Sequence, residues 1–181
     1  MKKLIVLVLA LCLLMGTVAM ATASAEKMGI GVYTPVSKAD NAYELDGDLY
    51  DGAVNADSTV CCVVLDDNGV IKAIRFDVTQ FKVTVKADGS VAGVTAGDRI
   101  LSKGEKKEAY GMVAYANAPA GEWYVQAAAF ESWCIGKTVE EVLGLELGED
   151  GKIVDADIKA SCSIIVSDWL KALELAAAEA R

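Results

Sequence analysis

The sequence predicts an α+β fold: a mainly antiparallel sheet, helices packed on one side of it, and a C-terminal helix. Two observations lead to this prediction. Between residues 28 and 87, β-forming apolar runs alternate with tight-turn sequences such as Asp67-Asn68-Gly69, a pattern typical of hairpins. After residue 120, apolar residues recur at helical spacing instead. We therefore expect the sheet to come first in the chain and the helices to follow it.

The strands are expected at 28–34, 59–65 and 70–78, with a further strand at 81–86. Residues 59–65 form a continuous apolar run, which predicts a central strand with both faces covered. Residues 81–86 alternate, so Phe81, Val83 and Val85 are expected to point inward.

Residues 37–56 are polar, acidic and glycine-bearing, which predicts a surface loop. Asp46, Asp48 and Asp51 in this segment do not fit a calcium loop, because the fifth position of an EF-hand is occupied by Tyr50. We interpret the segment as a solvated acidic loop without a metal site.

Two helices are expected in the second half, before the terminal one. Trp123, Ala127, Phe130 and Cys134 form a single helical stripe, which favours a core role for Trp123 over stacking on a flat ligand. Thr138 and Glu141 form a capping box for a short helix at 139–143, closed by Gly144. The leucine- and alanine-rich segment from about residue 167 predicts the C-terminal helix.

Residues 1–25 have the pattern of a secretory signal peptide. Lys2 and Lys3 precede an apolar run at 4–14, and the segment ends with Ala23-Ser24-Ala25. The apolar run is too short for a comfortable membrane span. We therefore expect cleavage after Ala25, a single domain at 26–181, and a secreted, extracellular protein that is not inserted in the membrane after cleavage.

Composition excludes several function classes. Loss of Lys2 and Lys3 changes the formal charge from −9 to −11, which disfavours nucleic acid and anionic lipid as partners. The sequence contains no histidine, so Ser-His-Asp and Cys-His nucleophile pairs are excluded, as are imidazole metal ligands. The sequence assigns neither catalytic nor metal-binding residues, and a stand-alone enzyme is not the favoured interpretation.

The mature chain keeps four cysteines, which are Cys61, Cys62, Cys134 and Cys162. An even number in an exported protein permits disulfides, whereas free cysteine also serves as a small buried apolar residue. Both interpretations stay open. A bridge between Cys61 and Cys62 is not expected, because neighbours on a strand face opposite ways.

The C-terminal stretch 157–164, Asp-Ile-Lys-Ala-Ser-Cys-Ser-Ile, resembles the flavin-attachment motif of exported FMN-binding domains, D-x-x-[S/T]-G-A-T-[I/L/V]. In this alignment Asp157 matches the aspartate, Ser163 replaces the flavin-bearing threonine, and Ile164 matches the final apolar residue. Ala160, Ser161 and Cys162 do not match, and the glycine of the motif is missing. The chain is also similar to a group of exported clostridial proteins at 122–124 and 136–142.

The resemblance implies an exported FMN-binding-like domain that acts as an extracytoplasmic flavin carrier for electron transfer. Ser163 would contact the FMN phosphate or carry it covalently, and Asp157 would orient Ser163. The alternative is a non-enzymatic extracellular binding or structural module that has lost flavin, whose partner would be a surface protein. Without the resemblance, Asp155 and Asp157 are interpreted as strand-edge charges.

Overall fold

The computed structural model describes residues 25–181, so all but the last residue of the expected signal peptide lies outside the described part. The strands are β1 (Lys27–Tyr33), β2 (Val36–Asp40), β3 (Tyr43–Leu45), β4 (Asp48–Tyr50), β5 (Gly52–Leu65), β6 (Ile71–Val85) and β7 (Val91–Ala92). The helices are α2 (Lys103–Lys106), the 3₁₀ helix η1 (Lys107–Tyr110), α3 (Met112–Ala116), α4 (Trp123–Cys134), α5 (Val139–Leu143), α6 (Ala156–Lys159) and α7 (Ser167–Ala178). This order confirms the predicted α+β fold, including its C-terminal helix.

The main sheet is antiparallel and has the order β1-β5-β6-β7, with β2 also pairing with β5. Strands β5 and β6 form a long hairpin. Its turn is closed by the carboxylate of Asp66, which accepts hydrogen bonds from the N–H groups of Asn68 and Val70, and Gly69 supplies the positive φ. The predicted hairpin and the central position of residues 59–65 are both confirmed.

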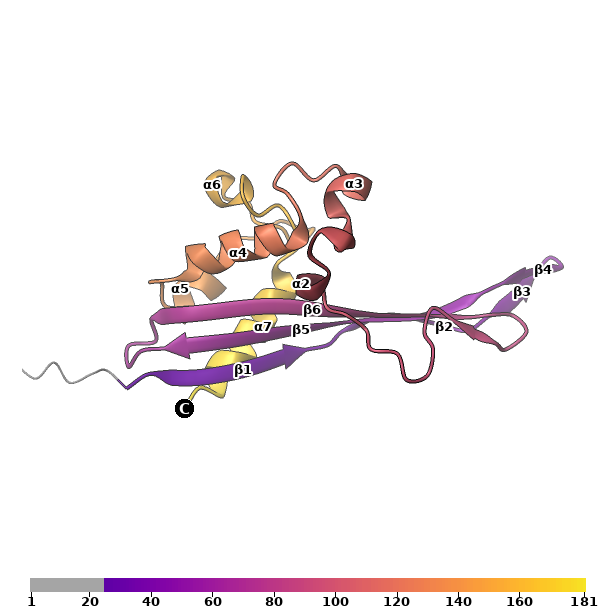
Figure 1. Cartoon of the computed structure of the whole chain (residues 1–181), viewed down its shortest axis with the longest axis horizontal. Coiled ribbons are helices and arrows are strands. Elements are labelled where there is room, and N and C mark those ends of the chain that lie inside the picture. The colour runs from indigo at the N-terminus through magenta and orange to yellow at the C-terminus, as the bar shows by residue number, and fades with distance from the viewer. Residues whose placement is uncertain (1–24) are drawn as a thin grey trace, which may run out of the picture.

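Helices cover only one face of the sheet. Helix α7 crosses behind β1 and β5, and α4 runs along β6 (Figure 1). The opposite face carries Met28, Ile30 and Val32, which are all more than half exposed, beside the half-buried Cys62 and Val64. The expectation that both faces of residues 59–65 are covered was therefore wrong, because within residues 25–181 no helix packs on the second face.

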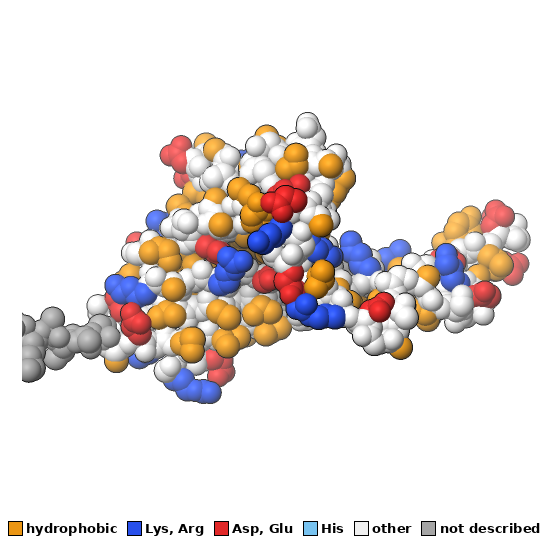
Figure 2. All heavy atoms as spheres, viewed as in Figure 1, with side chains coloured by type: hydrophobic (Ala, Val, Ile, Leu, Met, Phe, Trp, Pro, Cys, Tyr) orange, Lys and Arg blue, Asp and Glu red, His pale blue; other side chains and the backbone are white. Residues whose placement is uncertain are grey.

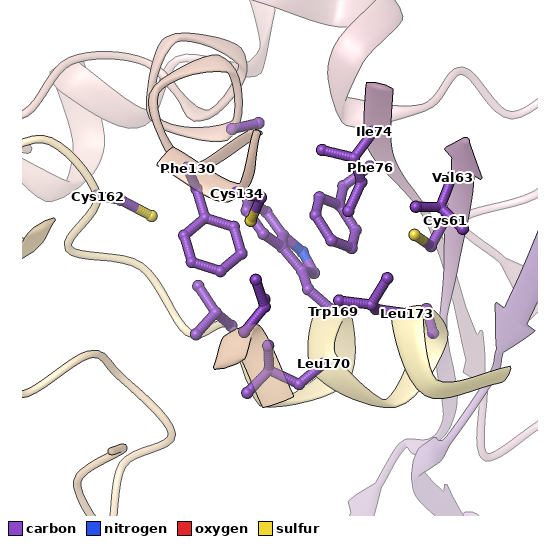
Figure 3. Packing of buried hydrophobic residues seen from close by; sticks show 14 of the residues in the cluster. Cys61, Val63, Ile74, Phe76, Phe130, Cys134, Cys162, Trp169, Leu170 and Leu173 are labelled. Carbon is purple, nitrogen blue, oxygen red and sulfur yellow. The ribbon is translucent and has the colours of Figure 1, made fainter. Parts of the chain in front are cut away.

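The core lies between this sheet and helices α4 and α7. Phe76 from β6 stacks on Trp169 of α7 with ring centroids 5.0 Å apart, and Phe130 of α4 lies 5.6 Å from Trp169 (Figure 3). Such aromatic contacts add to the stabilisation from apolar burial. The helical stripe predicted at 123–134 is buried in this core, and the capping box of Thr138 and Glu141 starts α5 as expected.

The four cysteines of the described part are free, which supports the filler interpretation. Cys61, Cys134 and Cys162 are buried among apolar side chains, as Figure 3 shows. Burial raises the pKa of the Cys134 thiol to about 12 and that of Cys162 to about 11. These three cysteines therefore behave as small apolar residues.

Two glycines allow α7 to lie directly on β1. A Cβ atom at Gly31 would be 2.1 Å from the carbonyl oxygen of Ala172, and one at Gly29 would be 1.8 Å from that of Ala176. No side chain fits between these two backbones. The glycines of the predicted first strand thus set the distance between sheet and helix.

An arm of strands extends beyond the helices (Figure 1). It contains β2, the β3–β4 hairpin and the distant halves of β5 and β6. The surface loop predicted at 37–56 was therefore wrong. The turn at Asp46 and Gly47, with φ angles of 53° and 87°, is a hairpin signal within that segment. Strands β2, β3 and β4 have both faces exposed to solvent.

The prediction of a separate strand at residues 81–86 was also wrong. They continue β6 instead of forming a separate strand, and Phe81 is exposed while Val83 and Val85 are only half-buried. Helices cover the sheet only near the body, so an alternating pattern on the arm has no core to face. The turn at Asp150 and Gly151 is flanked by isolated bridges, which pair Leu147 with Ile153 and Lys152 with Ile165.

Candidate ligand-binding cleft

A cleft of about 470 Å³ opens where the body of the sheet meets α2, α3 and the first turns of α4 and α7. This volume lies within the range of small-molecule sites. Its walls come from segments far apart in the sequence, and they include Asp57, Thr59, Val78, Lys103, Tyr110, Met112, Tyr115, Trp123, Lys152, Ser163, Ile164, Asp168 and Trp169.

Aromatic rings form much of the cleft wall. Trp123 and Trp169 meet edge to face with centroids 5.5 Å apart, and each also belongs to the core. Tyr110 and Tyr115 form a second edge-to-face pair at 6.1 Å, with Tyr115 largely exposed at the mouth. Trp123 therefore belongs to the core, as predicted, and also lines the cleft. Such a wall suits a planar apolar ligand.

Lys103 is one of the two cations that line the cleft, the other being Lys152. Its Nζ lies 5.4 Å from the ring centroid of Tyr110 and 5.9 Å from that of Trp123, within cation–π distance. Burial lowers the pKa of Lys103, and the negative charges of Asp57 and Asp168 oppose this shift. Lysine in this position presents an N–H donor beside the rings.

The backbone around Lys103 is held by Asp77. The hydroxyl of Ser102 donates to Oδ2 of Asp77 at 2.6 Å, and the N–H of Gly104 donates to Oδ1 at 3.0 Å. Ser102 and Glu105 also form a capping box that starts α2. These contacts fix the helix that carries Lys103 against strand β6.

Two carboxylates share the cleft with Lys103. Asp57 of β5 accepts a hydrogen bond from Nε2 of Gln80 at 2.8 Å, and Gln80 accepts one from the hydroxyl of Tyr110 at 3.3 Å. Asp168 lies in the first turn of α7. Burial raises the pKa of Asp168 and the charge of Asp57 adds to the shift, while Lys103 opposes it.

The structure brings two of the three predicted flavin residues into this cleft. Ser163 is half-buried, and both its N–H and its hydroxyl donate to Oε1 of Gln126, at 2.9 and 3.2 Å. Ile164 is buried and contributes apolar wall. Gln126 is itself fully buried and donates to the carbonyl of Gly121 at 2.8 Å, which ties the Ser163 segment to α4.

Asp157, the third predicted residue, is exposed on α6 and does not line the cleft. The side chain of Asp155 caps this helix by accepting from the N–H groups of Asp157 and Ile158. The interpretation of Asp155 and Asp157 as strand-edge charges was therefore wrong, because the segment forms a helical turn. Asp157 therefore does not share the cleft with Ser163 and Ile164.

Several residues of the cleft were not identified from the sequence. Lys103, Tyr110 and Tyr115 belong to a polar, glycine-bearing stretch without a recognised motif, although Ser102-x-x-Glu105 is a readable helix start. Asp57 directly follows the acidic segment at 37–56 and Asp168 lies in the expected terminal helix, but neither was identified as a site residue. Their proximity depends on the pairing of β5 with β6 and on the docking of α7.

Comparisons with protein-family models, with curated proteins and with solved structures found no match to this chain. Among residues 25–181, no group of three or more cysteine and carboxylate side chains is arranged to hold a metal ion. Within the same residues, no helix has the length and apolar character needed to cross a membrane.

Proposed function

We propose that the mature chain is an extracytoplasmic binding module that holds a flavin in the aromatic cleft. The observation that carries this proposal is the position of Ser163 and Ile164. These two residues were singled out by their resemblance to a flavin motif, and they line a cleft with four aromatic side chains. A flavin ring is planar and largely apolar, so stacking on such walls supports its binding.

The bound flavin would supply the redox chemistry, and the chain would supply the apolar slot and the Lys103 donor. We propose a role as an electron carrier instead of a stand-alone enzyme. We also propose that the flavin is held without a covalent bond, because the Ser163 hydroxyl is engaged by Gln126 and Asp157 lies elsewhere. An intact-mass measurement after coexpression with a flavin transferase tests this part; a mass increase of one FMN that Ser163→Ala removes would contradict it.

Quenching of flavin fluorescence by the mature chain tests the proposed function. Saturable quenching by residues 26–181 is expected with at least one of the two probes, riboflavin or FMN. Tyr115→Ala removes one wall of the cleft and should weaken binding about threefold to tenfold. Val113→Ala, on the same helix and outside the cleft, is the matched control and should have no effect. Absence of quenching with both flavins would refute the proposal.

A second candidate function, docking to a surface protein, is favoured by the tip of the arm. Tyr43 stacks on Tyr50 at 5.0 Å there, and Leu45 and Leu49 are exposed, beside acidic side chains (Figure 2). Apolar and acidic groups together fit a partner with a basic rim. A photo-crosslinker at Leu49 should then capture a basic host surface protein that the same group at Leu175, on α7, does not. Equal capture at both positions would contradict this role.

A further inference from the structure

We infer that the cleft selects a flavin without a phosphate group, so that riboflavin binds more tightly than FMN. This inference rests on the proposed function, and it names the ligand class of the same site. It departs from the resemblance, which implies FMN with Ser163 at its phosphate. Three features of the cleft support this inference. They are the balance of its charges, the hydrogen bonds that Ser163 already makes, and the side chains that make no hydrogen bond.

The ionisable side chains that line the cleft leave no positive charge to match a phosphate. The charge of Lys103 is offset by the carboxylates of Asp57 and Asp168, which line the same cleft and oppose the lowering of its pKa by burial. Lys152 is the second cation, and its Nζ pairs with Asp150 at 3.2 Å. The FMN phosphate carries about two negative charges at pH 7, and placing it among these carboxylates is unfavourable.

Apart from Lys103, the main hydrogen-bond donors near the predicted phosphate position are already engaged. Ser163 uses its N–H and its hydroxyl on the same oxygen of Gln126. The N-terminus of α7 attracts anions through its backbone dipoles, but Asp168 already places a carboxylate in that first turn. A phosphate would have to displace Gln126 or lie against Asp168.

Riboflavin, a neutral flavin, has polar groups that match the cleft side chains without a hydrogen-bond partner. Among residues 25–181, neither Lys103 nor Asp168 takes part in a side-chain hydrogen bond or an ion pair. The ring of riboflavin has carbonyl oxygens that accept from an ammonium group, and its ring N–H and ribityl hydroxyls donate to carboxylates. The cleft therefore offers riboflavin both a donor and an acceptor, whereas a phosphate dianion at Lys103 would lie beside two carboxylates.

The test is to titrate the mature chain with riboflavin and with FMN at pH 8, where the phosphate is fully ionised. Riboflavin is expected to bind at least tenfold more tightly. Asp168→Asn should tighten FMN binding about threefold to tenfold, with a smaller effect at high salt, whereas riboflavin, which loses a carboxylate acceptor, should bind no more tightly than before. Asp157→Asn, the same substitution at an exposed site outside the cleft, should leave both affinities unchanged. Circular dichroism confirms that each variant is folded.

The outcomes separate this inference from the proposed function. FMN binding as tight as riboflavin binding would overturn the selectivity and leave the flavin proposal standing. Equal changes for both ligands in Asp168→Asn would overturn its electrostatic basis. Failure of both ligands to bind would overturn the proposed function and this inference with it.

Discussion

Ser163 donates both its backbone N–H and its hydroxyl to one acceptor, Oε1 of Gln126, at 2.9 and 3.2 Å. The amide nitrogen of Gln126 donates in turn to the carbonyl of Gly121. One buried amide therefore joins the segment before α7 to both the body and the start of α4. The wall of the cleft depends on this connection.

Replacing Gln126 with leucine should destabilise the protein by about 2–4 kcal/mol, because it leaves the N–H of Ser163 and the carbonyl of Gly121 without partners. Ser163→Ala removes only the hydroxyl and should cost about 1 kcal/mol or less. Urea unfolding of the two variants measures both values. Equal stability of the leucine variant and the native protein would show that this connection is not needed.

Gly31 lies directly against α7, so a single methyl group added at this position should strongly destabilise the protein. Gly31→Ala places a carbon 2.1 Å from the carbonyl oxygen of Ala172, so the helix must move away from β1. We expect a loss of about 3 kcal/mol or more. Ile30→Ala, on the open face of the same strand, is the control and should cost less than about 1 kcal/mol. Thermal unfolding distinguishes the two, and similar losses would contradict the close packing.

Glu131 gives the stability a defined pH dependence. It is buried, accepts a hydrogen bond from the N–H of Phe76 at 2.8 Å, and has a pKa raised chiefly by burial. The folded state therefore binds a proton more readily than the unfolded chain, so the ionised carboxylate reduces stability at neutral pH. This cost disappears as the pH falls through the raised folded pKa toward the unfolded value.

Glu131→Gln keeps an oxygen acceptor for Phe76 and removes the buried charge. It should stabilise the protein by about 1 kcal/mol at pH 7 to 8. The difference from the native protein should shrink as the pH approaches the ordinary range of a glutamate pKa. Unfolding free energies measured across this pH range provide the test. A variant that is less stable at pH 8 than the native chain would contradict the argument.

The cysteines should differ sharply in reactivity. Cys62 lies on the open face of β5 and is half-buried, whereas Cys61, Cys134 and Cys162 are buried with raised pKa values. We expect iodoacetamide at pH 8 to modify Cys62 in the native protein and the other three only in denaturant. Peptide mass spectrometry identifies the sites. Prompt native labelling of Cys134 or Cys162, or a disulfide that protects either, would contradict the packing.

The sequence predicted the body of the fold well because its signals are local. The turn at Asp67-Asn68-Gly69, the stripe from Trp123 to Cys134 and the capping box at Thr138 each depend on residues a few positions apart. Strands β2, β3 and β4 of the arm were missed because they have no buried face. The uncovered face of β5 was missed because a continuous apolar run does not show which of its sides a helix will cover.

The cleft was predictable only in part. Ser163 and Ile164 were found through a motif resemblance, and both line the cleft. The same motif also assigned Asp157 to this site, which was wrong, because Asp157 lies on helix α6 and does not line the cleft. Lys103 and Asp168 are 65 positions apart in the chain, and their proximity follows from tertiary packing alone.

The central claim, that the aromatic cleft is the flavin site, is tested most directly by the tryptophan indole signals in an ¹⁵N-resolved NMR titration with riboflavin. The chain has three tryptophans, of which Trp123 and Trp169 line the cleft and Trp133 packs on Phe130 outside it. We predict saturable shifts of the Trp123 and Trp169 indole signals, with that of Trp133 unchanged. Shifts confined to Trp133, or no indole shift under saturating flavin, would contradict the account.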